Sequence, residues 1–249
     1  MASISLHVVH DKPLPVLGEF SKALPGSHSL NFARSGGKNC DPRCSHFRTD
    51  CYAERCEIRP DRAELAAKLA RHESTDPAEL ARRARYEIGW ELSRGIRAPW
   101  FRLFTNGSVP SRPSRRFALE LRQLLAYLHT NRIPVHFPIE TLEKARTYRR
   151  VVQGLCVVRE SCHTEARWLN AAGPVSISGG SAEMNRIERV NESKRLCRAR
   201  TMATGRKCIV CPAVASRYIH GVPNDKAKCG TGGCTACANP FIDVVYPKH

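Results

Sequence analysis

Two segments in the first half of the chain carry apolar residues at helical spacing. In the first, Leu80, Ala84, Ile88 and Leu92 recur at every fourth position. This spacing predicts a helix over residues 77–94, with Asp76 as its N-cap and Gly95 at its end. In the second, the apolar positions are Phe117, Leu121, Leu124, Leu125 and Leu128. They predict a helix that begins after Ser114, another favourable N-cap residue.

From residue 99 onward, short apolar runs alternate with helical patterns. Strands are expected at residues 100–105, 133–138, 155–158 and 174–178, and helices at 140–151 and 161–172. A strand at 29–35 and a helix at 61–72 are expected earlier in the chain. Strands separated by helices of this length predict a parallel sheet with right-handed crossovers. The expected fold class is α/β, as a partial parallel (β/α) barrel, although the pattern alone is equally consistent with an open sheet.

The end of the chain differs in composition from this alternating part. From about residue 190 it is rich in cysteine and basic residues and has little periodicity. We therefore expect two units. Residues 1–190 would form the α/β partial-barrel domain, and residues 191–249 a Cys-rich, basic, metal-binding C-terminal appendage.

The 249 residues carry a formal net charge of +17, which indicates an anionic partner, with nucleic acid ahead of a membrane surface. The densest basic stretch contains Lys194, Arg195, Arg198, Arg200, Arg206 and Lys207. We expect these side chains to contact nucleic acid, DNA rather than RNA; the alternative is that they pair with acidic neighbours in the fold. No segment reaches the ~18 apolar residues that cross a membrane, and no signal peptide is recognised, so a cytoplasmic location is expected. The oligomeric state stays open.

Nine of the twelve cysteines fall into two clusters. The first contains Cys40, Cys44, Cys51 and Cys56, and the second contains Cys208, Cys211, Cys229, Cys234 and Cys237. In a reducing compartment, thiolates at such spacing hold metal more often than they form disulfides. The first cluster suits zinc or a [4Fe–4S] cluster, and the spacing does not choose between them. In the second, Cys208-x2-Cys211 and Cys234-x2-Cys237 have the spacing of the paired knuckles of a zinc ribbon, whereas Cys229-x4-Cys234-x2-Cys237 has the spacing of plant-type ferredoxins, so the metal stays open there too. Cys156 is expected to be a small buried residue within a strand.

Polar residues follow several of the predicted strands, where a barrel enzyme would place its reactive groups. Glu140 lies just past the strand 133–138, His136 lies within it, and Glu160 follows the strand 155–158. These three are the candidate catalytic residues. The turns that contain Asn106, Ser108, Gly179 and Gly180 are candidates for binding a cofactor.

The cysteine motifs resemble those of the "gene product 88" family of phage and prophage proteins. The resemblance rests on Gly-Gly-Lys-Asn-Cys-x3-Cys-x6-Cys-Tyr-Ala-Glu after the leading strand, over residues 29–56. It continues over residues 208–249, with Cys-Ile-Val-Cys-Pro, then Cys-Gly-x3-Cys-x2-Cys, a hydrophobic strand and a terminal histidine. Between these ends it depends mainly on the order of strands and helices.

The first loop is also similar to that of radical S-adenosylmethionine enzymes, in which Cys-x3-Cys-x2-Cys after the first strand of a partial barrel binds a [4Fe–4S] cluster. This resemblance implies that Cys40, Cys44 and Cys51 are the cluster ligands and that S-adenosylmethionine is a candidate cofactor. The second gap is six residues here and two in that family.

These observations give three hypotheses for function. The first is a phage-type, radical-SAM-like iron–sulfur enzyme that modifies a base in nucleic acid. The second is base exchange with a Cys-bound zinc, similar to transglycosylases of the 7-deazaguanine type. Those enzymes use an aspartate nucleophile, whereas the strand-end acids here are Glu140 and Glu160. The third is a non-enzymatic, metal-stapled protein that binds nucleic acid or a host factor.

Overall fold

The computed structural model describes somewhat more than half of the chain, and every structural statement below concerns that part. The described residues are 15–19, 26–34, 37–40, 42, 63–103, 109–162, 168, 170–178, 200–201, 205–211 and 236–246.

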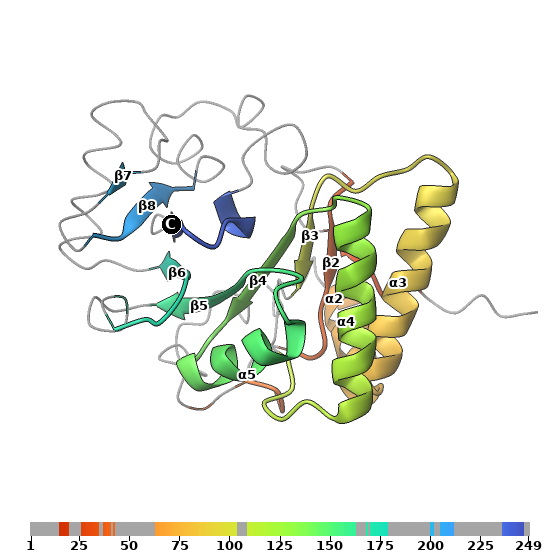
Figure 1. Cartoon of the computed structure of the whole chain (residues 1–249). Coiled ribbons are helices and arrows are strands. Elements are labelled where there is room, and N and C mark those ends of the chain that lie inside the picture. The colour runs from red at the N-terminus through yellow and green to blue at the C-terminus, as the bar shows by residue number, and fades with distance from the viewer. Residues whose placement is uncertain are drawn as a thin grey trace, which may run out of the picture.

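The described strands form one nine-stranded sheet, in the order β1-β2-β3-β4-β5-β6-β9-β8-β7 (Figure 1). The strands are β1 (Gly18–Glu19), β2 (His28–Leu30), β3 (Phe101–Leu103), β4 (Val135–Ile139), β5 (Val158–Cys162), β6 (Val175–Ser178), β7 (Arg200–Thr201), β8 (Lys207–Val210) and β9 (Asp243–Tyr246). From β2 to β8, in spatial order, every neighbouring pair is parallel. The edge strands β1 and β7 are antiparallel to their neighbours. The expected α/β fold with a parallel sheet is confirmed, and this open sheet is compatible with a partial barrel.

The C-terminal region contributes strands to this same sheet. β8 and β9 lie beyond residue 190, yet β9 pairs in parallel with β6 of the preceding region. A separate metal-binding appendage is not seen among the described residues. The expected boundary at residue 190 lies outside them.

Four of the predicted helices begin and end within two residues of their expected bounds. The helix expected at 161–172 does not, because β5 runs to Cys162 and residues 170–172 are not helical. The helices are α2 (Ala63–Ser74), α3 (Pro77–Ser93), α4 (Arg115–Thr130) and α5 (Leu142–Val152), with a short 3-10 helix η3 (Ala236–Ala238). The Asp76 carboxylate accepts a hydrogen bond from the Ala78 amide, and the Ser114 hydroxyl accepts one from the Phe117 amide. Gly95, with φ of +73°, follows α3 in the left-handed conformation that favours glycine. All five apolar residues of the predicted α4 stripe are buried.

The sheet has two chemically different faces. Alternate residues of β3, β4 and β5, among them Phe101, Phe137 and Val158, pack in one core with α3, α4 and α5. We call this side the helix-covered face. Because successive side chains of a strand point to opposite sides, the intervening residues occupy the other side, which we call the inner face. These inner-face residues are Ser29, Arg102, His136, Arg159, Ser161 and Ser176, which the strand register places side by side.

The expected strand at 155–158 is displaced. α5 ends at Val152, and both Gln153 (φ 49°) and Gly154 (φ 81°) adopt left-handed conformations that reverse the chain before β5 starts at Val158. Cys156 therefore precedes the strand rather than lying within it. Glu160 is inside β5 rather than past its end. The strand continues through polar residues because those side chains are buried in contacts of their own.

Candidate functional site

The segment that leads into the first cysteine cluster is held at its start by the end of α2. Glu73 accepts hydrogen bonds from the Lys38 amide (3.1 Å) and from Arg34 Nε (2.9 Å). Gly37 turns tightly here, and a side chain at this position would bring its Cβ to 2.5 Å from Glu73 Oε1. The Cys40 amide donates to the Gly37 carbonyl at 3.0 Å, so the backbone at this first cysteine is fixed.

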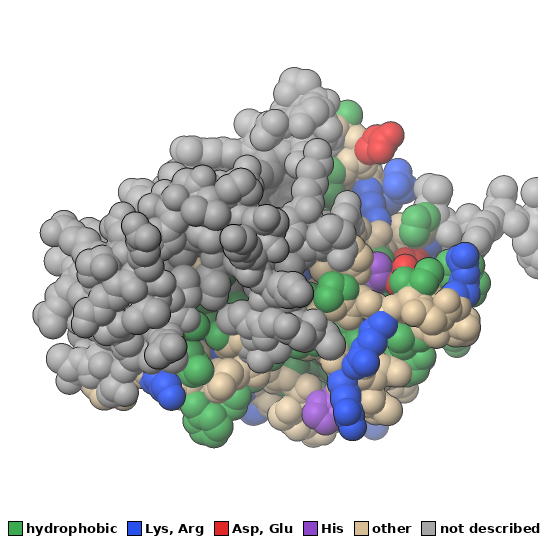
Figure 2. Space-filling model, turned by 90° about the horizontal axis from the view of Figure 1, so that it is seen from above, with side chains coloured by type: hydrophobic (Ala, Val, Ile, Leu, Met, Phe, Trp, Pro, Cys, Tyr) green, Lys and Arg blue, Asp and Glu red, His purple; other side chains and the backbone are tan. Residues whose placement is uncertain are grey.

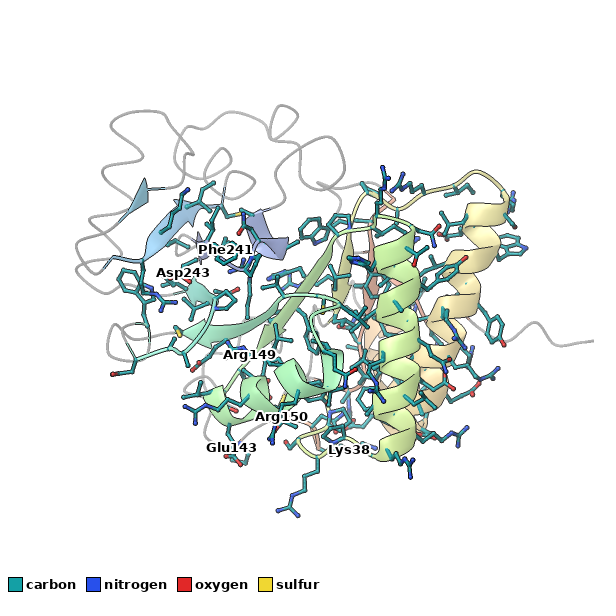
Figure 3. All side chains as sticks on the ribbon, in the orientation of Figure 1. Lys38, Glu143, Arg149, Arg150, Phe241 and Asp243 are labelled. Atoms are coloured by element: carbon teal, nitrogen blue, oxygen red, sulfur yellow. The ribbon has the colours of Figure 1, made fainter. Side chains whose placement is uncertain are left out.

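A buried lysine of α5 holds the same segment from its other side. Lys144, 3% exposed, donates to the Asn39 carbonyl at 2.8 Å and to Glu140 Oε1 at 2.6 Å. Glu140 directly follows β4, as predicted. Cys40 is thereby placed at the carboxyl end of β4. Figure 3 shows Lys38 and Glu143 at the same lower end of the molecule, in agreement with these contacts.

The Asn39 side chain adds a polar group beside Cys40. Asn39 is 6% exposed, and its Nδ2 has no hydrogen-bond acceptor within the part of the chain that the structure describes. A buried donor that lacks an acceptor is costly in a folded protein. It therefore indicates that a further acceptor approaches here.

The inner face places His136 between two arginines. His136 is 3% exposed. Its neighbour across the strands is Arg102 of β3, and Arg159 of β5 stands opposite Pro138, two residues further along. Burial lowers the pKa of His136 well below the ordinary value, and the two guanidinium groups lower it further. The imidazole is therefore neutral at pH 7 and can both donate and accept a hydrogen bond.

Arg159 holds the C-terminal cysteine region against the sheet. The side chain is completely buried, and its five N–H groups donate to five backbone carbonyls at 2.6–3.2 Å. Four of these carbonyls belong to Ala236, Cys237, Asn239 and Ile242, and the fifth to Val175. One side chain thus fixes the path of the backbone that carries Cys237.

The structure separates two of the C-terminal cysteines that the motif pairs. Cys208 is buried on the helix-covered side of the sheet, with Cys162 and Trp168. Cys211 packs on the inner side, with Cys237 beside it. Residues 208 and 211 of a strand and its continuation face opposite ways, so their side chains do not converge as the knuckle of a zinc ribbon requires. Cys211 and Cys237 do come together.

One of the predicted nucleic-acid contacts has a partner in the fold. Arg206 donates to both oxygens of Asp243, at 2.6 and 3.0 Å, and this contact raises the Arg206 pKa. The same carboxylate, labelled in Figure 3, accepts from Trp168 Nε1 and from the Val175 amide. Arg206 follows the alternative in which arginines of this stretch pair with acidic neighbours. Lys207 is exposed.

Glu160 is not placed as a strand-end acid. It shares the helix-covered side with Val158 and Cys162 of the same strand and is 2% exposed. Arg149 of α5 lies near it. Burial lowers the pKa of Arg149, and the charge of Glu160 opposes this shift. Figure 3 shows Arg149 on the helix side. Of the three candidate catalytic residues, His136 occupies the inner face and Glu140 the carboxyl edge.

Most other predicted site residues lie outside the described part of the chain. These are Cys44, Cys51, Cys56, Cys229, Cys234, Asn106, Ser108, Gly179, Gly180, Lys194, Arg195 and Arg198. Arg200 is described only through its backbone, in β7. Among the described side chains, no three of the His, Cys, Asp and Glu groups are close enough to hold a metal ion.

The sequence did not identify Glu73, Arg102, Lys144 or Arg159 as members of the site. Lys144 could have been predicted to pair with Glu140, because it lies four residues after Glu140 in a predicted helix, at the spacing of an ion pair. Arg159 could not, because its partners are backbone carbonyls.

The chain matches no protein-family model, and no curated protein or solved structure is significantly similar to it. None of the described helices is both long and apolar enough to cross a membrane.

Proposed function

We propose that the chain is a metal-dependent enzyme that modifies a base in nucleic acid, with its metal centre in the first cysteine loop. The position of Cys40 carries this proposal. Glu73 of α2 and Lys144 of α5 hold the backbone just before it, at the carboxyl end of β4. In parallel α/β proteins, reactive groups gather at this edge of the sheet.

The chemistry of the donors fits such a centre. Cys40, Cys44 and Cys51 would hold a [4Fe–4S] cluster, or these three with Cys56 would hold zinc. The Asn39 amide is a buried donor beside the first of these thiolates, and N–H donors around a metal's sulfur ligands tune its chemistry. A bound cluster would supply one-electron chemistry, with S-adenosylmethionine as the candidate cofactor. A second centre would draw on Cys211 and Cys237, joined by Cys229 and Cys234.

The inner face supports a polar, hydrogen-bonding substrate. A neutral, buried His136 flanked by Arg102 offers groups that hydrogen-bond to a base. Base exchange receives less support, because Glu160 points to the helix-covered side and Glu140 is engaged by Lys144. The net charge of +17 favours nucleic acid as the substrate class.

Anaerobic purification, with measurement of iron, sulfide, zinc and visible absorbance, tests the proposal. We expect a brown protein, loss of the first centre in Cys40→Ala, and roughly 10- to 100-fold weaker metal retention in Lys144→Met, because Lys144 positions the ligand loop. Arg150→Met, an exposed position on α5, is the matched control and should retain all metal. Full metal content in Cys40→Ala would overturn the proposal. A colourless zinc protein would overturn the iron–sulfur form and favour the zinc hypotheses.

A further inference from the structure

The outer side of α3 carries an exposed row of aromatic and arginine side chains. Arg82, Tyr86, Trp90 and Arg94 follow one another at every fourth position. Tyr86 is 61% and Trp90 53% exposed, although large aromatic side chains are usually buried. We call these four residues the α3 stripe. It lies opposite the side of α3 that packs in the core, and so on the other side of the sheet from the inner face.

The two rings of the α3 stripe form a stacking platform. They lie about one helical turn apart, roughly 6 Å along the axis. The Arg82 guanidinium lies 5.4 Å from the centre of the Tyr86 ring, and that of Arg94 lies 4.4 Å from the Trp90 ring. Guanidinium and aromatic groups both offer flat faces on which nucleic-acid bases stack.

Two of the three acidic residues of α3 are engaged away from the stripe. Glu87 accepts hydrogen bonds from the Val16 and Leu17 amides at 2.7 and 3.0 Å. Glu91 contacts His28 Nε2 at 2.5 Å. The third, Glu79, accepts two hydrogen bonds from Arg82 at 2.6 and 2.8 Å, so of the two stripe arginines only Arg82 has a carboxylate partner on α3. Figure 2 shows Lys and Arg side chains beside hydrophobic ones over the described part of the upper face, with fewer acidic ones.

We propose that the α3 stripe is a docking surface for single-stranded nucleic acid. Aromatic rings between cations serve a strand that presents bases and phosphates together, whereas a duplex hides its base faces. Tyr, Trp and Arg also dominate protein–protein contacts, but the stripe's arginines and the net charge of +17 favour a polyanion. The inference shares only its ligand class with the proposed function. It places a binding surface away from the catalytic face, independent of metal.

The three tryptophans allow a selective test. Trp100 is 3% exposed and Trp168 is completely buried, so quenching of tryptophan fluorescence by an added strand reports on Trp90. Fluorescein-labelled oligo(dT) and oligo(rU) of about 20 nucleotides are the probes, measured by anisotropy across a salt series. We expect quenching on binding, and an affinity at least roughly tenfold lower in the double variant Tyr86→Ala/Trp90→Ala. The slope of affinity against salt should be kept, because the arginines remain.

Leu119→Ala is the matched control, since this apolar residue of the neighbouring α4 is also exposed, at 48%. It should bind like the wild type. Wild-type affinity in the folded double variant, or unquenched Trp90 at saturation, would overturn the inference and would leave a protein partner as the explanation of the stripe. Metal content separates this result from the proposed function, because the double variant should keep its metal while Cys40→Ala should keep its binding.

Discussion

A buried cation contacts the backbone of each of the two cysteine-bearing segments, but the two cations act differently. Lys144 holds the first segment, residues 37–40, with one carbonyl and the carboxylate of Glu140. Arg159 holds the second, residues 236–242. All five of its N–H groups donate to backbone carbonyls, four of them in this segment and one at Val175. Lysine is a compact charge with rotatable donors, whereas the arginine donors form a rigid planar fork. The first anchor fixes one point of a loop, and the second fixes the shape of a whole turn.

The two segments should therefore respond differently when one of their contacts is removed. The first depends on several separate groups from α2 and α5, among them the carboxylates of Glu73 and Glu140. The second depends on a single side chain that keeps its charge at every accessible pH. Disruption of the second anchor should therefore cost more free energy of unfolding.

The largest effect is expected for Arg159→Met. The substitution leaves five carbonyls without their donor, and unsatisfied buried groups cost about 1–3 kcal/mol each before the structure relaxes. We expect the free energy of unfolding to fall by about 5 kcal/mol, or the C-terminal strands to detach. Urea denaturation and limited proteolysis, which should cut first within residues 200–246, measure this.

Arg150→Met is the control for Arg159→Met, because it removes an exposed arginine of α5 and should change stability by less than about 0.5 kcal/mol. Similar urea midpoints for the two variants would contradict the role assigned to Arg159. Arg159→Met should also keep the metal of the first loop, because the N–H groups of Arg159 donate to the second segment and to β6.

A smaller effect is expected for Arg206→Ala, which sharpens the comparison within the C-terminal region. Arg206 binds Asp243 and the carbonyls of Ala171 and Gly173. Its loss should lower the free energy of unfolding by about 3 kcal/mol, because Asp243 stays buried with one strong partner fewer. The neighbouring Lys207→Ala should leave stability unchanged and reduce the salt slope of nucleic-acid binding by about one. The reverse outcome, a stable Arg206→Ala with a reduced slope, would return Arg206 to the nucleic-acid interface.

The sequence predicts the helical half of this fold well because one physical rule decides it there. α3 and α4 bury one apolar stripe each against the sheet, so their periodicity and caps are visible in the residue order. The strands are less predictable because both faces of the sheet are buried. Because β5 carries buried polar residues such as Arg159 and Glu160, its sequence does not have the pattern of an apolar strand.

The residues of the candidate site also differ in how well the sequence predicts them. Glu140 could be placed because it follows a strand with a clear hydrophobic signal. Arg159 could not be predicted as a site residue. It donates to the backbone carbonyls of Ala236 and Cys237, 77 and 78 residues away, and every residue type has such a carbonyl, so the sequence does not indicate the contact. Cys208 and Cys211 show what spacing alone leaves out. Their spacing is typical of a metal knuckle, whereas strand geometry turns the two side chains to different sides of the sheet.

The smallest expected effect is a pH dependence of stability that arises at His72. His72, 5% exposed at the end of α2, contacts the Asn31 carbonyl through Nδ1 at 2.6 Å. Burial above all, and then the nearby cations with Lys68 first, lower the His72 pKa to about 4 against the opposing effect of the Asn31 carbonyl. The unfolded chain has the ordinary value of about 6.5. Between these values the unfolded state binds the proton and the folded state does not, so stability falls as pH drops from about 6.5 to 4.

Two histidine variants isolate this contribution. His136 also has a lowered pKa, so it too makes stability fall as the pH drops. The quantity to compare is therefore the difference in pH dependence between the wild type and His72→Gln. Glutamine can still donate to the Asn31 carbonyl but does not titrate. Between about pH 7 and pH 4.5, the wild type should lose about 2 kcal/mol more of its free energy of unfolding than the variant. His129→Gln, at an exposed position, should follow the wild type. If His72→Gln also follows it, His72 is protonated without loss of the Asn31 contact. If the curves separate as expected, the uncharged, buried form of His72 stabilises the fold at its contact with the Asn31 carbonyl.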